Sequence, residues 1–296
     1  MSTPRVDLPV TYNAATTFVD ENIKAGRGDK TAIYYVGEKI NYQTVFERVN
    51  QTGNALRELG LEIEQRVLLV LPDCPEFAYA FFGAIKIGAV PIPVNPWMKA
   101  KDYEYLLHDS RARVMIVHES ALSEVEPAWD QSRFLRHVLV VGKPRGRALS
   151  YESVLSKAST QPDAEPTGRD DVAFWVYTSG STGSPKGAVH LQHDMITITE
   201  LFVKPFLGMK EDDLCFSASK LFFSYGLGNS LYIPFRCGAS TVLWPERPEP
   251  EKVLEVIERH RPSFFFSVPT LYARLLRVEK KFDLSSLRIC LSSGES

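Results

Sequence analysis

One turn region of the sequence concentrates groups that bind phosphate. Residues 177–189 contain three glycines, five Ser or Thr hydroxyls and one lysine. Glycine permits positive φ and close approach of the backbone to a ligand. Successive backbone N–H groups can converge on an anion, hydroxyls add donors, and the lysine adds a mobile positive charge. The segment therefore favours polyphosphate binding, and the residues expected to contact phosphate are Thr178, Ser179, Gly180, Ser181, Thr182, Gly183 and Lys186.

The spacing of this segment separates it from two common nucleotide-binding loops. Pro185 stands before Lys186 where the ordinary mononucleotide loop has glycine, and the chain contains no G-x-G-x-x-G segment. A cluster of Gly and Ser is also typical of a flexible surface hairpin, and the residue types leave this alternative open. The Pro-Lys-Gly embedded between apolar segments favours binding over a linker.

The segments around this loop alternate between two hydrophobic patterns. Short apolar runs predict strands at residues 67–71, 90–94, 114–117, 138–141, 172–177, 214–217, 241–243, 264–268 and 287–291. Helical patterns lie between them at residues 76–87, 101–108, 250–259 and 270–277, and another begins near His193. The sequence therefore predicts an α/β fold with mostly parallel sheets, in which a polar connection at residues 160–171 precedes the strand that enters the loop.

Composition argues against several classes of partner. The 296 residues are 44% hydrophobic and 24% charged, and 34 Lys and Arg stand against 36 Asp and Glu, a net charge of −2. Without an evident basic cluster, this balance argues against nucleic acid or an anionic membrane as a partner. The four cysteines, Cys74, Cys215, Cys237 and Cys290, lie far apart, so we expect buried reduced thiols and no zinc site.

The apolar segments predict a cytoplasmic protein. The first ten residues lack the apolar core of ~7 to 15 residues that a secretory signal needs. The most apolar stretch, residues 78–94, is interrupted by Lys86, Pro91 and Pro93 and falls short of the ~20 apolar residues of a membrane helix. We interpret it as a core helix that leads into a strand.

Two polar clusters are interpreted as structural. His190, His193 and Asp194 have the spacing of a metal pair on a helix, but zinc needs further ligands, and Asp194 favours the start of a helix. Asp212 and Asp213 precede an apolar strand and predict a solvated turn rather than a site with paired carboxylates.

From Thr178 onward the sequence resembles the adenylate-forming (AMP-binding) superfamily of acyl-CoA synthetases, adenylation domains and luciferases. The loop of that superfamily has the pattern T-S-G-[ST]-T-G-x-P-K-G-V, and this chain matches it except that Ala188 replaces the usual valine. Residues 86–96 are similar to a core element of the family, and residues 292–295 to the start of its adenine-binding segment. For residues 86–96 both the resemblance and the residues predict a structural role: a helix that ends at Gly88, a strand, and prolines that stop pairing.

The resemblance covers the chain from about Tyr12 and implies a fold. Residues 1–296 are expected to form an incomplete N-terminal AMP-binding domain of two packed αβ subdomains, at residues 68–205 and at residues 12–67 plus 206–296. The chain would then end before the β-barrel part and before the small C-terminal domain with the catalytic lysine. No catalytic residue is expected in this chain, and negligible ligase activity is expected from it alone.

Residues 221–229 look most like benzoate-CoA ligases and related aryl-CoA ligases. Phe223 matches the aromatic near the acyl-adenylate, Ser224, Tyr225 and Gly226 match the wall of the acyl pocket, and Ser293 is assigned to the same pocket. Aromatic residues that stand next to small residues can form a flat apolar slot that suits a ring. Composition alone also allows these aromatics to be ordinary core residues.

The resemblance implies an ATP-dependent ligase that activates an aromatic carboxylic acid as acyl-AMP, releases pyrophosphate and then transfers the acyl group to coenzyme A. Positioning and charge stabilisation dominate such phosphoryl chemistry. Mg²⁺ is the implied cofactor with Thr182 as a contact, and Gly294, Glu295 and Ser296 would border the adenine. A homodimer is left open. Two rival functions also stay open: an adenylating ligase for an aliphatic acid or an amino acid, and a non-catalytic nucleotide-binding fragment.

Overall fold

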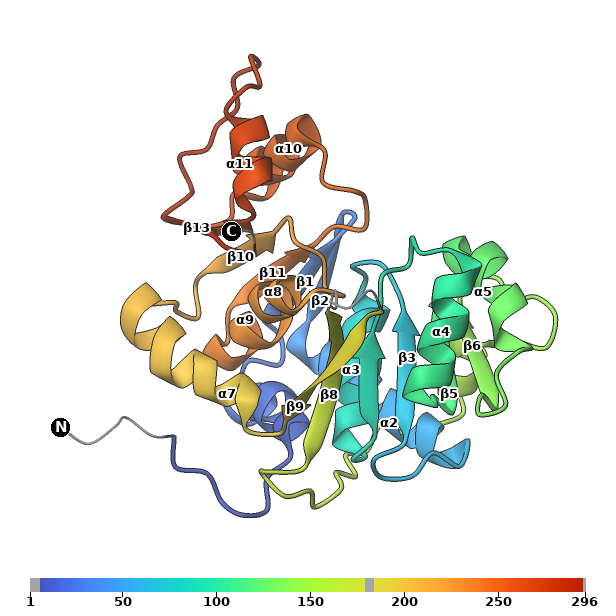
Figure 1. The fold of residues 1–296 in the computed structure, drawn as a ribbon. Coiled ribbons are helices and arrows are strands. Elements are labelled where there is room, and N and C mark those ends of the chain that lie inside the picture. The colour runs from blue at the N-terminus through green and yellow to red at the C-terminus, as the bar shows by residue number, and fades with distance from the viewer. Residues whose placement is uncertain (1–5, 179–183, 295–296) are drawn as a thin grey trace.

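Two sheets organise the chain, and the computed structural model describes residues 6–178 and 184–294. The first sheet has five parallel strands in the order β4-β3-β5-β6-β7. The second has six strands in the order β13-β12-β10-β11-β1-β2, and in it β2 runs antiparallel to β1 while the other paired strands are parallel. The expected α/β fold with mostly parallel sheets is confirmed (Figure 1).

The strands are short and close to their predicted places. The first sheet contains β3 (Arg66–Val70), β4 (Val90–Pro93), β5 (Val114–His118), β6 (His137–Val141) and β7 (Leu149–Ser150). The second contains β1 (Thr31–Tyr35), β2 (Glu38–Asn41), β10 (Leu214–Ser217), β11 (Ser240–Leu243), β12 (Phe264–Ser267) and β13 (Ile289–Ser292).

The first sheet is buried on both faces. Leu69 of β3 faces a core shared with α2 (Tyr42–Glu58) and α3 (Pro75–Lys86), and this core also takes in Leu243 of the second sheet. Leu68 faces the opposite core, which contains residues of α4 (Ala100–Ser110) and α5 (Leu122–Trp129). Because successive side chains of a strand point to opposite faces, a strand covered on both sides is continuously apolar. Helices α2 and α3 thus contribute to a core that both sheets share.

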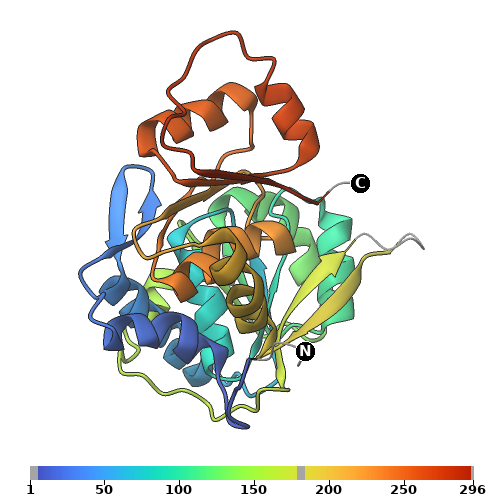
Figure 2. The same ribbon diagram turned by 90° about the vertical axis from the view of Figure 1, so that its left-hand side faces the viewer.

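The second sheet is covered in the same way. Cys215 of β10 faces a core with residues of η3 (Thr199–Leu207) and α9 (Ile233–Cys237). Phe216, the next residue, faces a core with residues of α10 (Pro250–His260) and α11 (Pro269–Leu275). Figure 2 shows α10 and α11 as the outermost layer, above the sheet. Shorter elements complete the chain: η1 (Thr16–Asp20), α1 (Glu21–Lys24), η2 (Glu119–Ala121), α6 (Tyr151–Leu155), α7 (Asp194–Ile198), α8 (Ser224–Leu227) and η4 (Gly228–Tyr232).

The predicted phosphate loop connects an antiparallel hairpin. Strand β8 (Val172–Thr178) pairs with β9 (Lys186–Leu191), and the pair Thr178 with Lys186 is the last before the connection. The hairpin packs against β4 of the first sheet. An antiparallel hairpin therefore flanks the predicted loop, and phosphate binding by the loop stays a prediction.

The ribbon of β1 and β2 and the long helix α2 are the main elements that the sequence analysis missed. Asn41 caps α2, because its side chain accepts the backbone N–H of Thr44 at 2.9 Å. Val45, Val49 and Leu56 are buried at helical spacing. These two signals could have identified the helix. The division into two subdomains stays a prediction.

Two further findings concern exposure. Cys74, Cys215 and Cys237 are buried free thiols as expected, but Cys290 is exposed because it lies on β13 at the edge of the second sheet. Within the described residues, no helix combines the length and the apolar character needed to cross a bilayer.

Candidate functional site

A cavity of about 700 Å³ opens where the carboxyl ends of strands from both sheets meet. Ligands of open α/β sheets bind at this edge, because the loops that follow the strands converge there. Lys220 follows β10, Val268 follows β12 and Gly294 follows β13. Trp97 comes from the segment after β4 of the other sheet, and Val176, Tyr177 and Thr178 of β8 close the remaining side. The fold thus assembles the cavity from residues that are distant in sequence.

Aromatic residues form one wall of the cavity. Phe223 is 51% exposed and its ring centroid lies 4.6 Å from that of buried Phe222. Phe222 in turn packs edge to face on Trp97, with centroids 5.6 Å apart. Aromatic pairs favour such tilted and edge-on contacts. A buried ring therefore fixes the two rings, Trp97 and Phe223, that line the cavity.

Tyr225 extends this wall with a fixed hydroxyl. Its O–H donates to the carbonyl of Leu291 at 3.2 Å, and its ring meets Phe266 edge on. Burial raises the pKa of Tyr225 to about 12, so the hydroxyl stays protonated at neutral pH. The side chain offers the cavity an apolar ring rather than a charge.

The other predicted acyl-pocket residues differ in whether they line the cavity. Ser224 lines it beside Phe223 and Tyr225. Gly226 is buried and does not line it, and a Cβ there would lie 2.1 Å from the carbonyl oxygen of Lys220, so this position requires glycine for packing. Ser293 is exposed and outside the lining, and its N–H donates to the carbonyl of Ser267 at 3.2 Å.

The predicted phosphate-binding residues are only partly described. Thr178 lines the cavity, and its hydroxyl donates to the carbonyl of Lys186 at 3.4 Å. Lys186 is exposed at the start of β9, and Gly294 lines the cavity from the adenine-binding segment. The remaining predicted residues lie outside the described part of the chain: Ser179, Gly180, Ser181, Thr182, Gly183, Glu295 and Ser296.

Lys220 is a cavity residue that the sequence analysis missed. Its side chain is 3% exposed, and its ammonium lies 3.6 Å from the carboxylate of Asp73 and donates to the carbonyl of Trp244. Asp73 also accepts the N–H of Leu221 at 2.9 Å. Burial raises the pKa of Asp73 and lowers the pKa of Lys220. The sequence did contain a signal for this residue, because Lys220 directly precedes the apolar residues 221–223.

The polar clusters behave differently from one another. Among the described residues, no group of three His, Cys, Asp or Glu side chains could hold a metal ion. Asp194 begins α7 and accepts the N–H of Leu191 at 3.0 Å, in the helix-start role expected of it. The solvated turn predicted for Asp213 is wrong, because its carboxylate is buried and binds the guanidinium of Arg288 at 2.7 Å.

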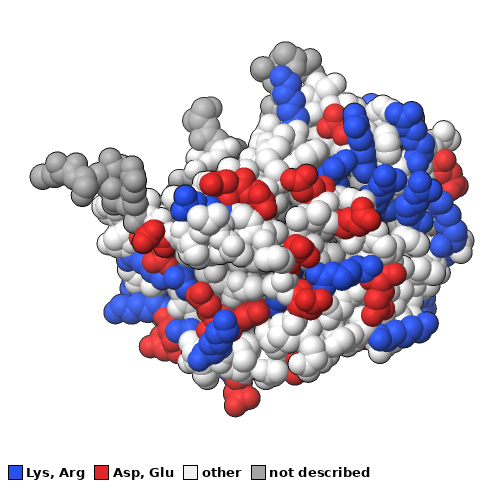
Figure 3. Space-filling model, turned by 90° about the horizontal axis from the view of Figure 1, so that it is seen from below, with Lys and Arg blue, Asp and Glu red and all other residues white. Residues whose placement is uncertain are grey.

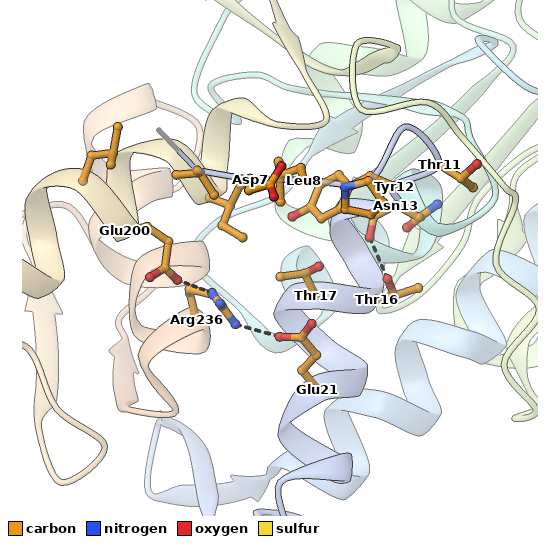
Figure 4. A pocket seen from close by; sticks show the side chains of 14 residues that line it. Asp7, Leu8, Thr11, Tyr12, Asn13, Thr16, Thr17, Glu21, Glu200 and Arg236 are labelled. Atoms are coloured by element: carbon orange, nitrogen blue, oxygen red, sulfur yellow. Dashed lines mark hydrogen bonds and ion pairs between the residues drawn. The ribbon is translucent and has the colours of Figure 1, made fainter. Parts of the chain in front are cut away.

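A second cavity, of about 640 Å³, lies beside the N-terminal segment (Figure 4). Arg236 stands between two carboxylates there and donates to Glu21 at 2.6 Å and to Glu200 at 2.7 Å. These charges satisfy one another, and neither the hairpin nor the aromatic wall reaches this cavity. The first cavity is therefore the candidate site.

The surface also carries a cluster of basic side chains that is not evident from the sequence. Figure 3 shows Lys and Arg side chains gathering on the side where the five-stranded sheet lies. Burial lowers the pKa of Arg66, and the charges of Arg111 and Arg113 lower it further. The expectation of no nucleic-acid partner remains a prediction.

Comparison with known proteins identifies the relatives of this fold and site. Residues 19–296 match the AMP-binding enzyme family. The chain is 44% identical to a benzoate-CoA ligase of Thauera aromatica, over 99% of this chain and 56% of the relative. It is 39% identical to a 4-hydroxybenzoate-CoA/benzoate-CoA ligase of Rhodopseudomonas palustris, over 96% of this chain and 53% of the relative.

Solved structures agree with these relatives. The crystal structure of the anthranilate CoA ligase AuaEII in complex with anthranoyl-AMP superposes with a TM-score of 0.94 at 36% identity, covering 98% of this chain and 56% of that one. A benzoate CoA ligase from Burkholderia xenovorans LB400 gives a TM-score of 0.87 at 35% identity, covering 96% of this chain and 56% of that one.

The chain therefore belongs to the AMP-binding enzyme family. The expected similarity to benzoate-CoA ligases is confirmed. The chain spans about half the length of the curated relatives it matches.

Proposed function

We propose that this chain supplies the nucleotide-binding and aryl-acid-binding part of an ATP-dependent aryl-CoA ligase similar to benzoate-CoA ligase. In the first step a carboxylate oxygen of the aromatic acid attacks the α-phosphorus of ATP and pyrophosphate leaves. In the second the thiol of coenzyme A loses its proton and attacks the acyl carbonyl, and AMP leaves. The observation that carries the proposal is a single cavity bordered by Thr178 of the hairpin and by the aromatic wall.

Each side of the cavity has a role in this proposal. Trp97, Phe223 and Tyr225 offer flat apolar surface to an aromatic ring, since stacked and edge-on contacts favour a ring over an aliphatic chain. Thr178 and Lys186 stand at the two ends of the loop expected to hold the β- and γ-phosphates. A leaving pyrophosphate is stabilised by donors and positive charge placed around it.

The metal, the cellular location and the assembly state belong to the same proposal. Bound Mg²⁺ neutralises phosphate charge, and the resemblance assigns Thr182 as its contact. Cytoplasmic location and the open possibility of a homodimer are carried over from the sequence and the family resemblance.

Calorimetric titration of the 296-residue chain tests the binding half of the proposal. We expect Mg·ATP and benzoate to bind and acetate to bind at least about tenfold more weakly than benzoate, because an apolar ring buries more area. Equal affinity for acetate and benzoate would contradict the aryl pocket and favour the aliphatic rival.

The reaction itself is tested in a protein of the relatives' length that carries this chain. We expect ATP–pyrophosphate exchange that depends on benzoate, followed by benzoyl-CoA formation when coenzyme A is added. Binding of both ligands without any exchange in such a protein would favour the non-catalytic rival.

A further inference from the structure

Helix α4 contacts the phosphate-binding hairpin through two side chains. The hydroxyl of Tyr105 donates to the carbonyl of Pro185 at 2.8 Å, and the hydroxyl of Tyr177 donates to the carboxylate of Asp109 at 2.6 Å. Tyr105 and Asp109 are four residues apart on α4, so they lie on one face of the helix. We propose that Tyr105 and Asp109 are positioning residues that hold the hairpin for nucleotide binding, an inference that rests on the proposed function.

Both contacts act at the end of the hairpin that carries the loop. Pro185 directly precedes Lys186, and Tyr177 directly precedes Thr178. Thr178 and Lys186 form the last pair of the ladder before the connection. One contact therefore holds each strand, immediately next to the residue from which the phosphate loop begins.

The hairpin has only two strands, so contacts from another element add to its stability. A two-stranded ribbon is marginally stable by itself. Strand β8 packs against β4, and at the loop end of the hairpin the side chain of Thr178 makes a long hydrogen bond of 3.4 Å to Lys186. The rings of Tyr105 and Tyr177 also pack against the core below α4. Helix α4 therefore supplies two tertiary contacts to the loop end.

The contact between Tyr177 and Asp109 is the stronger of the two by its chemistry. Burial raises the pKa of Tyr177, and its hydrogen bond to the Asp109 carboxylate raises it further, so the phenol remains a donor at neutral pH. A hydroxyl that donates to a carboxylate makes a short, charge-assisted bond. The contact between Tyr105 and the Pro185 carbonyl is a neutral bond, so its loss should cost less.

Neither residue of α4 lines the cavity, so both act through the hairpin. Their loss should weaken nucleotide binding, while the aromatic wall of Trp97, Phe223 and Tyr225, which is not part of the hairpin, keeps its affinity for the acid. This separation distinguishes a positioning role from general stabilisation of the fold.

The test uses Tyr105→Phe, Asp109→Ala and the double variant of the 296-residue chain. We expect Mg·ATP affinity to fall about threefold to tenfold for each single change, with the larger loss for Asp109→Ala, as for the removal of one neutral or one charged hydrogen bond. Benzoate affinity should stay within about twofold. Asp109→Asn keeps an acceptor for the Tyr177 hydroxyl and should restore most of the ATP affinity. Tyr34→Phe is the matched control, because within the described residues the hydroxyl of Tyr34 makes no hydrogen bond.

Amide hydrogen exchange supplies a readout that does not depend on nucleotide binding. We expect faster exchange in residues 176–178 and 186–188 of the variants and unchanged exchange in α3. Unchanged hairpin exchange would overturn the inference, and so would an equal loss of ATP and benzoate affinity. Failure of the unmodified chain to bind Mg·ATP would instead contradict the proposed function, while the exchange data would still decide whether α4 positions the hairpin.

Discussion

Lys86 and Lys220 are two buried lysines that pair with aspartates in different regions of the molecule. The Lys86 ammonium lies 2.6 Å from Asp20 and 2.5 Å from the side-chain oxygen of Asn50, in the core shared by the two sheets. The Lys220 ammonium lies 3.6 Å from Asp73, at the wall of the candidate site. One pair joins helices inside the scaffold, and the other joins two loops at the carboxyl edges of the two sheets.

The two pairs have similar residue types but different surroundings. Lys86 ends α3 and reaches Asp20 of η1 and Asn50 of α2, so its charge and donors are compensated by two side chains from two other elements. The carboxylate of Asp73 instead accepts the N–H of Leu221, close to the aromatic wall. A buried charge left without its partner is costly, so each lysine constrains the elements around it.

The largest effect on stability is expected for Lys86→Ala. The change leaves the Asp20 carboxylate unpaired in the core and should lower the free energy of unfolding by about 3–5 kcal/mol. Urea unfolding followed by circular dichroism measures it, with Lys24→Ala at the end of α1 as the control. A loss comparable to that of the control would remove the distinction between the two lysines.

Lys220→Met should cost less stability but should alter the site. Asp73 retains the N–H of Leu221 and can accept a proton, so we expect a loss of about 2–3 kcal/mol in the free energy of unfolding. Benzoate affinity should fall about tenfold, because the ion pair that holds Lys220 beside residues 221–225 is lost, while Mg·ATP affinity changes less. Calorimetric titration of both ligands measures the split, and an equal fall for both ligands would refute a role specific to the aryl wall.

Lys186→Ala sharpens the comparison with a lysine that is exposed. The free energy of unfolding should be unchanged within error, because the side chain is on the surface. Mg·ATP affinity should fall about tenfold or more, since a hydrogen bond to a charged phosphate is lost, and adenylation should slow in a protein of the relatives' length. Lys186→Arg keeps the charge and is the control. An unchanged ATP affinity and adenylation rate would remove this lysine from the mechanism.

The smallest effect expected concerns the pH dependence of stability, to which Asp73 and Asp213 should contribute with opposite sign. Burial alone would raise the pKa of Asp213, but hydrogen bonds from Arg288, Lys210 and Ser263 hold it below its ordinary value. Its stabilising contribution is therefore present above the ordinary pKa of about 4 and is lost as the pH falls through the lower folded value. Asp73 has a raised pKa, so its contribution is present at low pH and is lost as the pH rises through the folded value.

Thermal unfolding between about pH 5 and pH 2.5 measures this difference around the ordinary carboxyl pKa. Asp213→Asn should flatten the loss of melting temperature on acidification, whereas Asp73→Asn should steepen it. If the melting temperature falls with pH at the same rate in both variants, neither Asp213 with Arg288 nor Asp73 with Lys220 controls the loss of stability in acid.

The structure places the predicted site residues unequally around the cavity. Thr178, Phe223, Ser224, Tyr225 and Gly294 line it, because a hairpin end and strand-following loops converge on one edge. Gly226 and Ser293 do not, since one packs against the backbone of Lys220 and the other is exposed beyond β13. Motif position alone does not distinguish a residue that faces the cavity from its neighbour.

The sequence by itself determined the α/β class and most strand positions, and it marked out the hydroxyl-rich loop that is predicted to bind phosphate. These are local properties, because hydrophobic period, glycine content and motif spacing are written along the chain. Tertiary structure decided what those signals could not contain: the pairing of β1 with β11, the buried partners of Lys86 and Lys220, and the anchoring of the hairpin by α4. Each depends on contacts between segments distant in sequence, which form only when the sheets and helices pack and exclude water.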